Sequence, residues 1–383
     1  MAEWQGGSVF VSGYAPLTGN AAKPGMARQT GAAPAAASIT DEWRRWVAEN
    51  VLLRHEPNSI VDAMVRGGVD RPTAAREVQA ALNHPYLRAA LQAAPAQPGS
   101  AAAGSLEAKL QKRDWVLELI RKSAHMSARL GEVPRLPKLS RQDFLDNHYA
   151  ANRPVVMTGA MDDWPALSRW TDDDLKRRFG ERIVEVQANR NSDANYEINQ
   201  TKLRTEMPLA EFVDLTRTVG ETNNYYITAN NSGKNKEALR ELWDDIVVFP
   251  EYLRDDEPAN RGFFWFGPKG TVTPLHHDLT NNFMAQVRGR KLCRLIAPYE
   301  LPRVYNSRHC YSQVDLDHVD YDRFPLFRDV TVVDVVIGPG DLLFLPVGWW
   351  HYVRGLDISI TMTFTNFVFD NDFFSMYTTY QDI

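Results

Sequence analysis

The sequence TPLHHDLTNNFMAQVRGRK occupies residues 273–291 and contains the pattern on which the interpretation of the chain depends. If its first part forms a β-strand, successive side chains alternate between the two faces of that strand. His276 and Asp278 then point to one face, and His277 points to the other. Imidazole and carboxylate groups both bind metals, so one strand offers two candidate ligands. The pair alone does not define a metal site, because the same spacing occurs on surfaces and in hydrogen-bonded cores.

Short strand-like segments surround this stretch and are separated by turns rich in Gly and Pro. The expected strands are residues 154–159, 182–187, 225–228, 262–266, 283–287, 291–297, 331–336, 341–345 and 359–369. Many short strands in succession are typical of a closed double-sheet structure. We therefore predict a mainly β fold whose core is a jelly-roll barrel, also called a double-stranded β-helix, with flanking helices.

The N-terminal part of the chain differs in composition and periodicity. Residues 1–37 are rich in Ala, Gly and Pro, which predicts a flexible leader. Helical periodicity within residues 38–92 predicts a small bundle of three helices. This bundle either docks a partner or substrate, or only covers part of the main domain. Residues 93–104 are expected to form a linker, and residues 105–383 the main domain.

The main domain is expected to begin with a long helix that ends near Leu130, before Pro134 and Pro137. Apolar residues recur at helical spacing along this segment. The predicted buried stripe comprises Leu106, Leu110, Val116, Leu117, Ile120 and Ala124.

Composition excludes several classes of protein. The 383 residues carry 43 Lys and Arg against 48 Asp and Glu, a net charge of -5, which argues against a nucleic-acid binder driven by bulk positive charge. Cys293 and Cys310 are too few for a disulfide scaffold or a cysteine-ligated zinc cluster. No secretory signal pattern is present, and no apolar run approaches about 18 residues. We expect a cytoplasmic protein without a membrane segment or a nucleic-acid partner.

A third candidate ligand follows the sequence GPGDLLFLPVGWWH at residues 338–351. This stretch predicts a turn, a buried strand and a second turn that delivers His351. With His276 and Asp278 it completes two histidines and one carboxylate, the arrangement that leaves three positions open on non-haem Fe(II). A hydrolytic zinc site needs only one open position. We therefore predict that His276, Asp278 and His351 form an iron centre, which is also the catalytic centre.

The ordered set of motifs resembles the JmjC-type, cupin-like 2-oxoglutarate oxygenases. The matching residues are His276, Asp278, Asn282, Gln286, Gly289, Lys291, the segment 338–341 and the segment 349–351. Within this family the pattern is most similar to the asparaginyl hydroxylase called factor inhibiting hypoxia-inducible factor, whose pattern also fits SQVDLD at 312–317 and YDRFP at 321–325. The similarity extends from about residue 154 to residue 369 and does not include the helical bundle.

The resemblance also implies a binding site for 2-oxoglutarate and O2 beside the iron. Lys291 would pair with the distal carboxylate of 2-oxoglutarate, helped by the hydroxyl groups of Thr273 and Tyr226. A turn at residues 288–289 and a return strand would bring the Lys291 amine across the barrel. A buried diacid needs such a cation, because an unpaired carboxylate is costly to desolvate. Tyr225 would face the cosubstrate instead of Tyr226 if the strand register slipped by one residue.

Two asparagines complete the site that the resemblance implies. Asn282 and Asn366 would contact the end of 2-oxoglutarate that binds iron. Asn366 could instead only satisfy buried backbone groups.

The implied activity is hydroxylation of an amino-acid side chain in a protein or peptide, coupled to decarboxylation of 2-oxoglutarate to succinate. Tyr311 and Val368 differ in chemistry from the residues at which the asparaginyl hydroxylase grips its peptide, so asparagine specificity is not expected to transfer. The alternatives are hydroxylation of a small metabolite or peptide natural product, demethylation of N-methyl lysine, and a non-catalytic metal-binding cupin module. Only seventeen residues follow Asn366, so the helical pair through which the asparaginyl hydroxylase dimerises is not expected, and the oligomeric state stays open.

Overall fold

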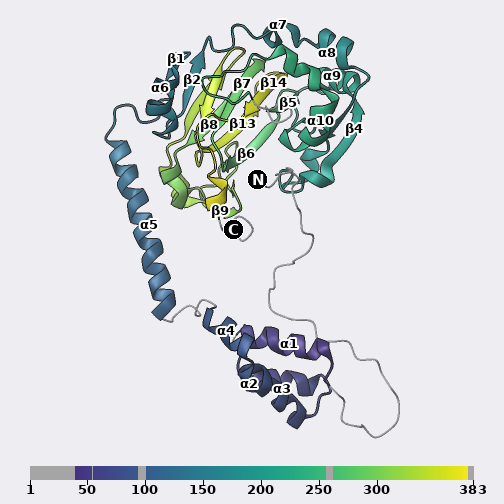
Figure 1. Ribbon diagram of the computed structural model, residues 1–383, viewed down its shortest axis with the longest axis vertical. Coiled ribbons are helices and arrows are strands. Elements are labelled where there is room, and N and C mark those ends of the chain that lie inside the picture. Colours follow the sequence, from purple (N-terminus) through teal and green to yellow (C-terminus); the bar gives the residue numbers. More distant parts are fainter. Residues whose placement is uncertain (1–38, 54, 94–100, 256–261, 378–383) are drawn as a thin grey trace. The chain divides into compact units, whose positions relative to one another are not determined.

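The computed structural model describes residues 39–53, 55–93, 101–255 and 262–377 (Figure 1). The chain divides into two compact units, residues 1–111 and residues 112–383. The predicted leader lies outside the described residues, and so does most of the predicted linker. In the described ranges, no helix is both long and apolar enough for a membrane span.

The first unit contains a small helical bundle, as the periodicity predicted, but with four helices in its described part. They are α1 Asp41–Leu52, α2 Pro57–Arg66, α3 Arg71–Asn83 and α4 Pro85–Ala93. The fourth helix was not expected. It starts at a proline directly after His84, whose extended backbone ends α3, and proline suits the first position of a helix. Val47, Met64 and Val78 are buried in the core of the bundle.

Helix α5 (Ala101–His125) begins inside the predicted linker and ends before Leu130. The predicted buried stripe is wrong for most of its length, since Val116 and Ile120 are 40% and 44% exposed. A polar anchor holds the helix instead. Arg121 donates to the buried carboxylate of Glu300 at 3.1 Å and to the carbonyl of Asp329 at 2.7 Å. Apolar spacing in sequence could not reveal this anchor.

The described part of the second unit contains two six-stranded sheets. The first has the order β1 (Arg135–Pro137), β2 (Val155–Thr158), β12 (Leu342–Leu345), β7 (Asn282–Arg288), β14 (Ser359–Phe364), β5 (Phe263–Gly267). The second has the order β11 (Val333–Ile337), β8 (Lys291–Ile296), β13 (Trp350–Gly355), β6 (Val272–His277), β10 (Tyr311–Ser312), β9 (Asn306–Arg308). A separate pair consists of β3 (Ile183–Gln187) and β4 (Arg204–Pro208).

Successive strands alternate between the two sheets from β5 to β8 and again from β11 to β14. This alternation is characteristic of the double-stranded β-helix, so the predicted jelly-roll core is confirmed. The turn after β7 crosses from one sheet to the other at Gly289, whose φ is +64°. A side chain there would collide with the carbonyl of Ile358, which explains the glycine.

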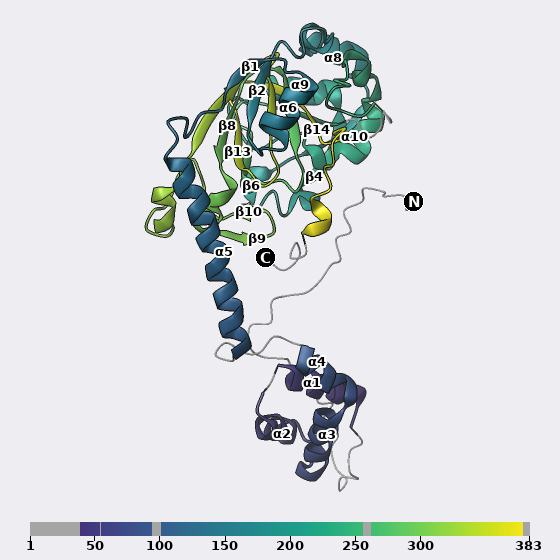
Figure 2. The ribbon, with the colours of Figure 1, turned by 60° about the vertical axis from the view of Figure 1, so that its left-hand side comes forward.

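Helices cover the outer face of the first sheet (Figure 2). They are α6 (Arg141–Phe144) with the π-helical turn η1 (Leu145–Tyr149), α7 (Ala166–Arg169), α8 (Asp172–Phe179), α9 (Leu209–Thr218) and α10 (Ser232–Ala238). Short 3-10 segments connect the larger elements: η2 (Arg190–Ser192), η3 (Gln200–Leu203), η4 (Ala229–Asn231), η5 (Arg240–Asp245), η7 (Pro298–Arg303), η8 (Pro325–Asp329) and η9 (Phe374–Met376). Leu175 and Phe212 of the helices share one continuous apolar core with Phe283 and Phe344 of the sheet.

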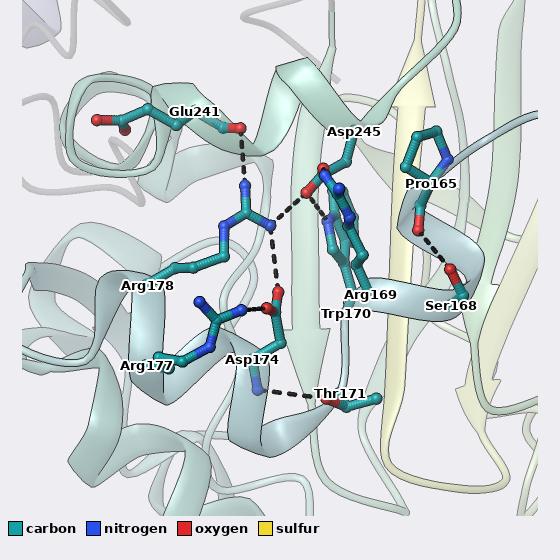
Figure 3. Close-up of polar contacts among 10 residues, drawn as sticks. All are labelled: Pro165, Ser168, Arg169, Trp170, Thr171, Asp174, Arg177, Arg178, Glu241 and Asp245. Carbon is teal, nitrogen blue, oxygen red and sulfur yellow. Dashed lines mark hydrogen bonds and ion pairs between the residues drawn. The ribbon is translucent and has the colours of Figure 1, made fainter.

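A buried carboxylate fastens this helical layer (Figure 3). Asp245, at the end of η5, has a fully buried side chain that accepts hydrogen bonds from Arg169, Trp170 and Arg178. Burial alone would raise the pKa of Asp245, but the hydrogen bonds from these three residues hold it below its usual value. The network joins α7 and α8 to η5.

Candidate metal centre

Three side chains from β6, its end and β13 converge as predicted. His276 and His351 are directly paired across β6 and β13, so their imidazoles lie on the same face, with ring centroids 4.0 Å apart. Asp278 follows β6 and places its Oδ1 atom 3.6 Å from Nε2 of His276 and its Oδ2 atom 3.9 Å from Nε2 of His351. One donor atom from each residue lies within 4.8 Å of the others, a spacing that lets one ion contact all three.

A turn precedes His351, as predicted: it ends at Gly348, and His351 is the second residue of strand β13. His277 does point away from the centre, as expected, and packs against Trp350 with a centroid distance of 4.8 Å. Asp278 keeps 29% of its side chain exposed, so the centre is open to solvent on one side.

Backbone carbonyls fix the protonation of both histidines. Nδ1 of His276 lies 2.8 Å from the carbonyl oxygen of Pro274, and Nδ1 of His351 lies 3.0 Å from that of Trp349. A carbonyl can only accept, so each Nδ1 carries the proton and each Nε2 offers a lone pair. Orientation of this kind is the usual support for metal-binding histidines.

The electrostatics of the three groups suit a divalent cation. Burial, followed by the neighbouring His351, lowers the pKa of His276 to about 4, and burial also lowers the pKa of His351. Burial acts to raise the pKa of Asp278, but the two histidines and a 3.2 Å hydrogen bond from Asn282 lower it below its usual value. Two neutral imidazoles and a carboxylate therefore face one another, which is the donor set that Fe(II) takes in facial sites.

Asn282, the first residue of β7, also fits its predicted place. Its Nδ2 atom donates to Asp278, whereas its Oδ1 atom is buried without a partner among the described residues. An orphaned buried acceptor is costly, so it indicates a group that the chain itself does not provide.

Lys291 lies at the start of β8 with only 1% of its surface exposed. Its Nζ atom donates to the hydroxyl of Tyr226 at 3.0 Å and lies 6.0 Å from the ring centre of Trp265. Among the described residues no carboxylate forms an ion pair with this ammonium group. A buried cation with one hydrogen bond suits an anionic ligand.

The contact with Lys291 also shows which of the two neighbouring tyrosines faces the interior of the barrel. Tyr226 is 2% exposed and points inward, whereas Tyr225 and Ile227 pack against the core on the outer face of the first sheet.

Thr273 lies on the same face as His276, although the two are three positions apart and simple alternation predicts opposite faces. His276 pairs with His351 and Thr273 pairs with Val353, so β6 contains one extra residue between the two pairs. Such a bulge reverses the alternation locally. The bulge therefore brings the Thr273 hydroxyl to the face on which the resemblance required it.

Asn366 is the predicted residue that the structure does not bring to the others. Strand β14 ends at Phe364, and Nδ2 of Asn366 donates to the carbonyl of Arg254 at 2.8 Å. Asn366 lines a small cavity with Phe364 and tryptophans of the helical side. This corrects the prediction. The inward position near the end of β14 is Thr363, which pairs with Met284 of the inner core and accepts a 3.0 Å hydrogen bond from Trp265.

Sequence reasoning also missed a charged pair beside the site. Arg190 is 1% exposed, and its guanidinium donates to Glu197 at 2.6 Å and to the carbonyl of Val272 at 2.7 Å. The guanidinium lies 5.1 Å from the ring centre of Tyr226. The charge of Glu197 acts to raise the pKa of His276, so the pair is electrically coupled to the centre. The stretch around Arg190 has no periodicity that would have identified it.

Comparison with known proteins agrees with this geometry. A family described as the cupin-like domain matches residues 141–373. Lysine-specific demethylase 8 of Xenopus tropicalis is 33% identical over 247 residues, which cover 61% of this chain and 52% of the demethylase. JmjC domain-containing protein D of Dictyostelium discoideum is 29% identical over 261 residues, covering 60% of this chain and 54% of that protein.

The name of a third relative refers to tRNA and not to a protein. The tRNA wybutosine-synthesizing protein 5 of Gallus gallus is 27% identical over 244 residues, covering 60% of this chain and 76% of its own length. This chain spans about half the length of the other two relatives. These comparisons support the JmjC and cupin resemblance but do not support a particular similarity to the asparaginyl hydroxylase. Since the family match covers more than half of the chain and includes all three candidate ligands, the chain belongs to the cupin-like domain family.

Proposed function

We propose that this protein is an Fe(II)- and 2-oxoglutarate-dependent oxygenase that hydroxylates an amino-acid side chain of a protein or peptide. The proposal rests on two features that occur together, a set of metal ligands and a buried cation. His276, Asp278 and His351 converge, and the buried Lys291 lacks an anionic partner among the described residues. Neither a hydrolytic zinc site nor a simple metal-binding module requires the second of these features.

The residues of the two sites would have different tasks in this reaction. His276, Asp278 and His351 would hold Fe(II), which when bound activates O2 while 2-oxoglutarate is decarboxylated to succinate and CO2. Lys291 would hold the distal carboxylate, and the Tyr226 hydroxyl would orient the Lys291 ammonium group.

The surrounding residues tune that geometry. Asn282 keeps Asp278 in one orientation through its amide, and its unpartnered Oδ1 atom would be available to the end of the cosubstrate that binds iron. The carbonyls of Pro274 and Trp349 keep both imidazoles in the tautomer that binds metal. The buried inner core beneath the centre excludes water from one side of the site.

The identity of the acceptor is a finer question, and demethylation of N-methyl lysine is the second candidate. It is favoured by the relative named lysine-specific demethylase 8. Hydroxylation of an N-methyl carbon gives an unstable carbinolamine, so one oxidation serves both outcomes. A polypeptide partner, a cytoplasmic location and the absence of a nucleic-acid partner stay predictions from sequence.

Succinate release from 2-oxoglutarate by the Fe(II)-reconstituted full-length chain tests the proposal. We expect release in wild type and its loss in Asp278→Ala. The matched control is Asp334→Ala, which removes a carboxylate that is 58% exposed on β11, pairs with Arg294 and is not one of the three candidate ligands. If wild type binds Fe(II) but never releases succinate, even with cell extract as a source of acceptors, the non-catalytic module is the correct interpretation.

Mass spectrometry of peptides from the same incubations separates the two acceptor chemistries. A gain of one oxygen supports stable side-chain hydroxylation. Loss of a methyl group together with formaldehyde release supports demethylation instead.

A further inference from the structure

Gln187, the last residue of β3, is a buried amide without a partner. It is 2% exposed, and neither its Nε2 nor its Oε1 atom has a hydrogen-bond partner among the described residues. Leaving a buried polar group unpaired costs about 1–3 kcal/mol, so such groups normally find a partner. A buried glutamine is also a poor choice for a purely structural strand position, because an apolar residue would avoid that cost. The unpaired amide therefore indicates a ligand group at this point.

The backbone places this amide beside the Lys291 contact. Gln187 and Tyr226 are directly paired, with N–H to carbonyl distances of 2.8 and 3.0 Å in the two directions. Side chains of a directly opposed pair lie on the same face, with Cβ atoms about 4.5–5.5 Å apart. Val186 and Ile227, the neighbours of the pair, point into the core on the outer face of the first sheet. Gln187 and Tyr226 consequently point together toward the interior, where the Tyr226 hydroxyl meets Lys291.

Arg190 keeps this end of β3 in place. Its guanidinium lies over the Tyr226 ring and donates to the carbonyl of Val272, the first residue of β6. The segment that follows Gln187 is thereby tied both to Tyr226 and to the strand that carries His276. This fastening limits how far the Gln187 side chain can move from the Tyr226 ring.

The chemistry of the unpaired atoms defines the ligand class. Lys291 and Gln187 both present N–H groups, and the Tyr226 hydroxyl can donate its own proton while it accepts from Lys291. A carboxylate has two oxygens with about four acceptor positions, enough for all three donors. We propose that the Gln187 amide donates a hydrogen bond to the distal carboxylate of 2-oxoglutarate and so forms a third member of that subsite. This inference rests on the proposed function.

Calorimetric titration of Fe(II)-loaded, full-length protein without oxygen tests the assignment with two ligands. The first is 2-oxoglutarate, and the second is 2-oxopentanoate, in which a methyl group replaces the distal carboxylate. A hydrogen bond to a charged group is worth enough that Gln187→Leu should weaken 2-oxoglutarate binding by about tenfold to a hundredfold. Binding of 2-oxopentanoate should change by less than about twofold, because the partner of Gln187 is missing from this ligand.

Two further variants make the result specific. Gln187→Glu retains the shape of the side chain but adds a negative charge, so it should weaken 2-oxoglutarate binding more than Gln187→Leu and again spare 2-oxopentanoate. Gln142→Leu is the matched control, because the Gln142 amide is exposed on α6 and donates to Asp146 at 2.9 Å. It should bind both ligands as wild type does.

The remaining outcomes overturn the inference in distinguishable ways. Equal loss of both ligands in the Gln187 variants would assign Gln187 a general structural role. Unchanged 2-oxoglutarate affinity in Gln187→Leu would remove it from the subsite, although the proposed function would stand. If wild-type protein loaded with Fe(II) did not bind 2-oxoglutarate at all, both the inference and the proposed function would fail.

Discussion

Replacing Lys291 by methionine should stabilise the ligand-free protein while it abolishes tight binding of 2-oxoglutarate. Lys291 is 1% exposed, and Nζ has one hydrogen bond, to Tyr226, and no ion pair among the described residues. Burying an ammonium group costs several kcal/mol, which its contacts with Tyr226 and Trp265 offset only in part. Methionine has a similar length and no charge, so it fills the same space without that cost.

The two effects have opposite signs and different sizes. We expect the free energy of unfolding of the ligand-free variant to rise by about 1–2 kcal/mol, or roughly 2–8 °C in Tm. Loss of one partner from a buried charge pair typically costs about 3–5 kcal/mol, so the affinity for 2-oxoglutarate should fall roughly a hundredfold to several thousandfold.

Thermal unfolding with and without 2-oxoglutarate measures both quantities in one assay. The ligand should raise Tm of the metal-loaded wild type and leave that of Lys291→Met unchanged. Lys269→Met is the control, because Lys269 is 53% exposed and pairs with Glu221 on the surface. A Lys291→Met protein that melts earlier than wild type and still gains stability from 2-oxoglutarate would refute the reasoning.

Three further changes test other parts of the structure. His351→Ala should reduce bound Fe(II) per chain, measured by metal analysis after desalting, while the circular dichroism spectrum stays that of wild type. Asn366→Ala should change the 2-oxoglutarate dissociation constant by less than about twofold, because Asn366 bonds to Arg254 and shares no partner with the metal ligands or Lys291. Asp245→Asn should lower the free energy of unfolding in urea by about 2–4 kcal/mol at pH 7. The pKa of Asp245 is depressed in the folded state, so the carboxylate stabilises the fold above the usual aspartate pKa of 3.8. This stabilisation is lost as pH falls through the folded pKa. The variant should therefore lose less stability than wild type on acidification.

The sequence contained enough information for the strands and the three ligands, since these depend on local pattern. Apolar alternation and glycine or proline turns marked most strands, and the turn at Gly289 returned Lys291 to the interior as expected. The last strand was predicted to run to residue 369 but ends at Phe364. A longer strand would not have brought Asn366 to the site either, because alternation puts it on the same face as Phe364, which packs in the outer core.

Features that depend on contacts between distant segments were not predictable. The bulge that brings Thr273 to the inner face is visible only from the pairing of β6 with β13. The pair formed by Arg190 and Glu197, and the alignment of Gln187 with Tyr226, require β3 to be placed against the barrel. The exposure of the apolar side chains of α5 was not predictable for the same reason. The helix is held by the contact between Arg121 and Glu300, which lies far away in the sequence.

The charges of the buried site lead to a last prediction, that metal and cosubstrate bind cooperatively. Asp278 and Glu197 carry two negative charges, and Lys291 and Arg190 carry two positive charges, so these four groups sum to zero. Fe(II) alone would add two positive charges, and 2-oxoglutarate alone would add two negative charges, in a place where water screens poorly. Together they restore neutrality. Calorimetry should therefore show 2-oxoglutarate binding at least about tenfold more tightly to the metal-loaded protein than to protein in EDTA, within the usual range of coupling between sites. Equal affinities in the two conditions would mean that charge balance does not govern this site.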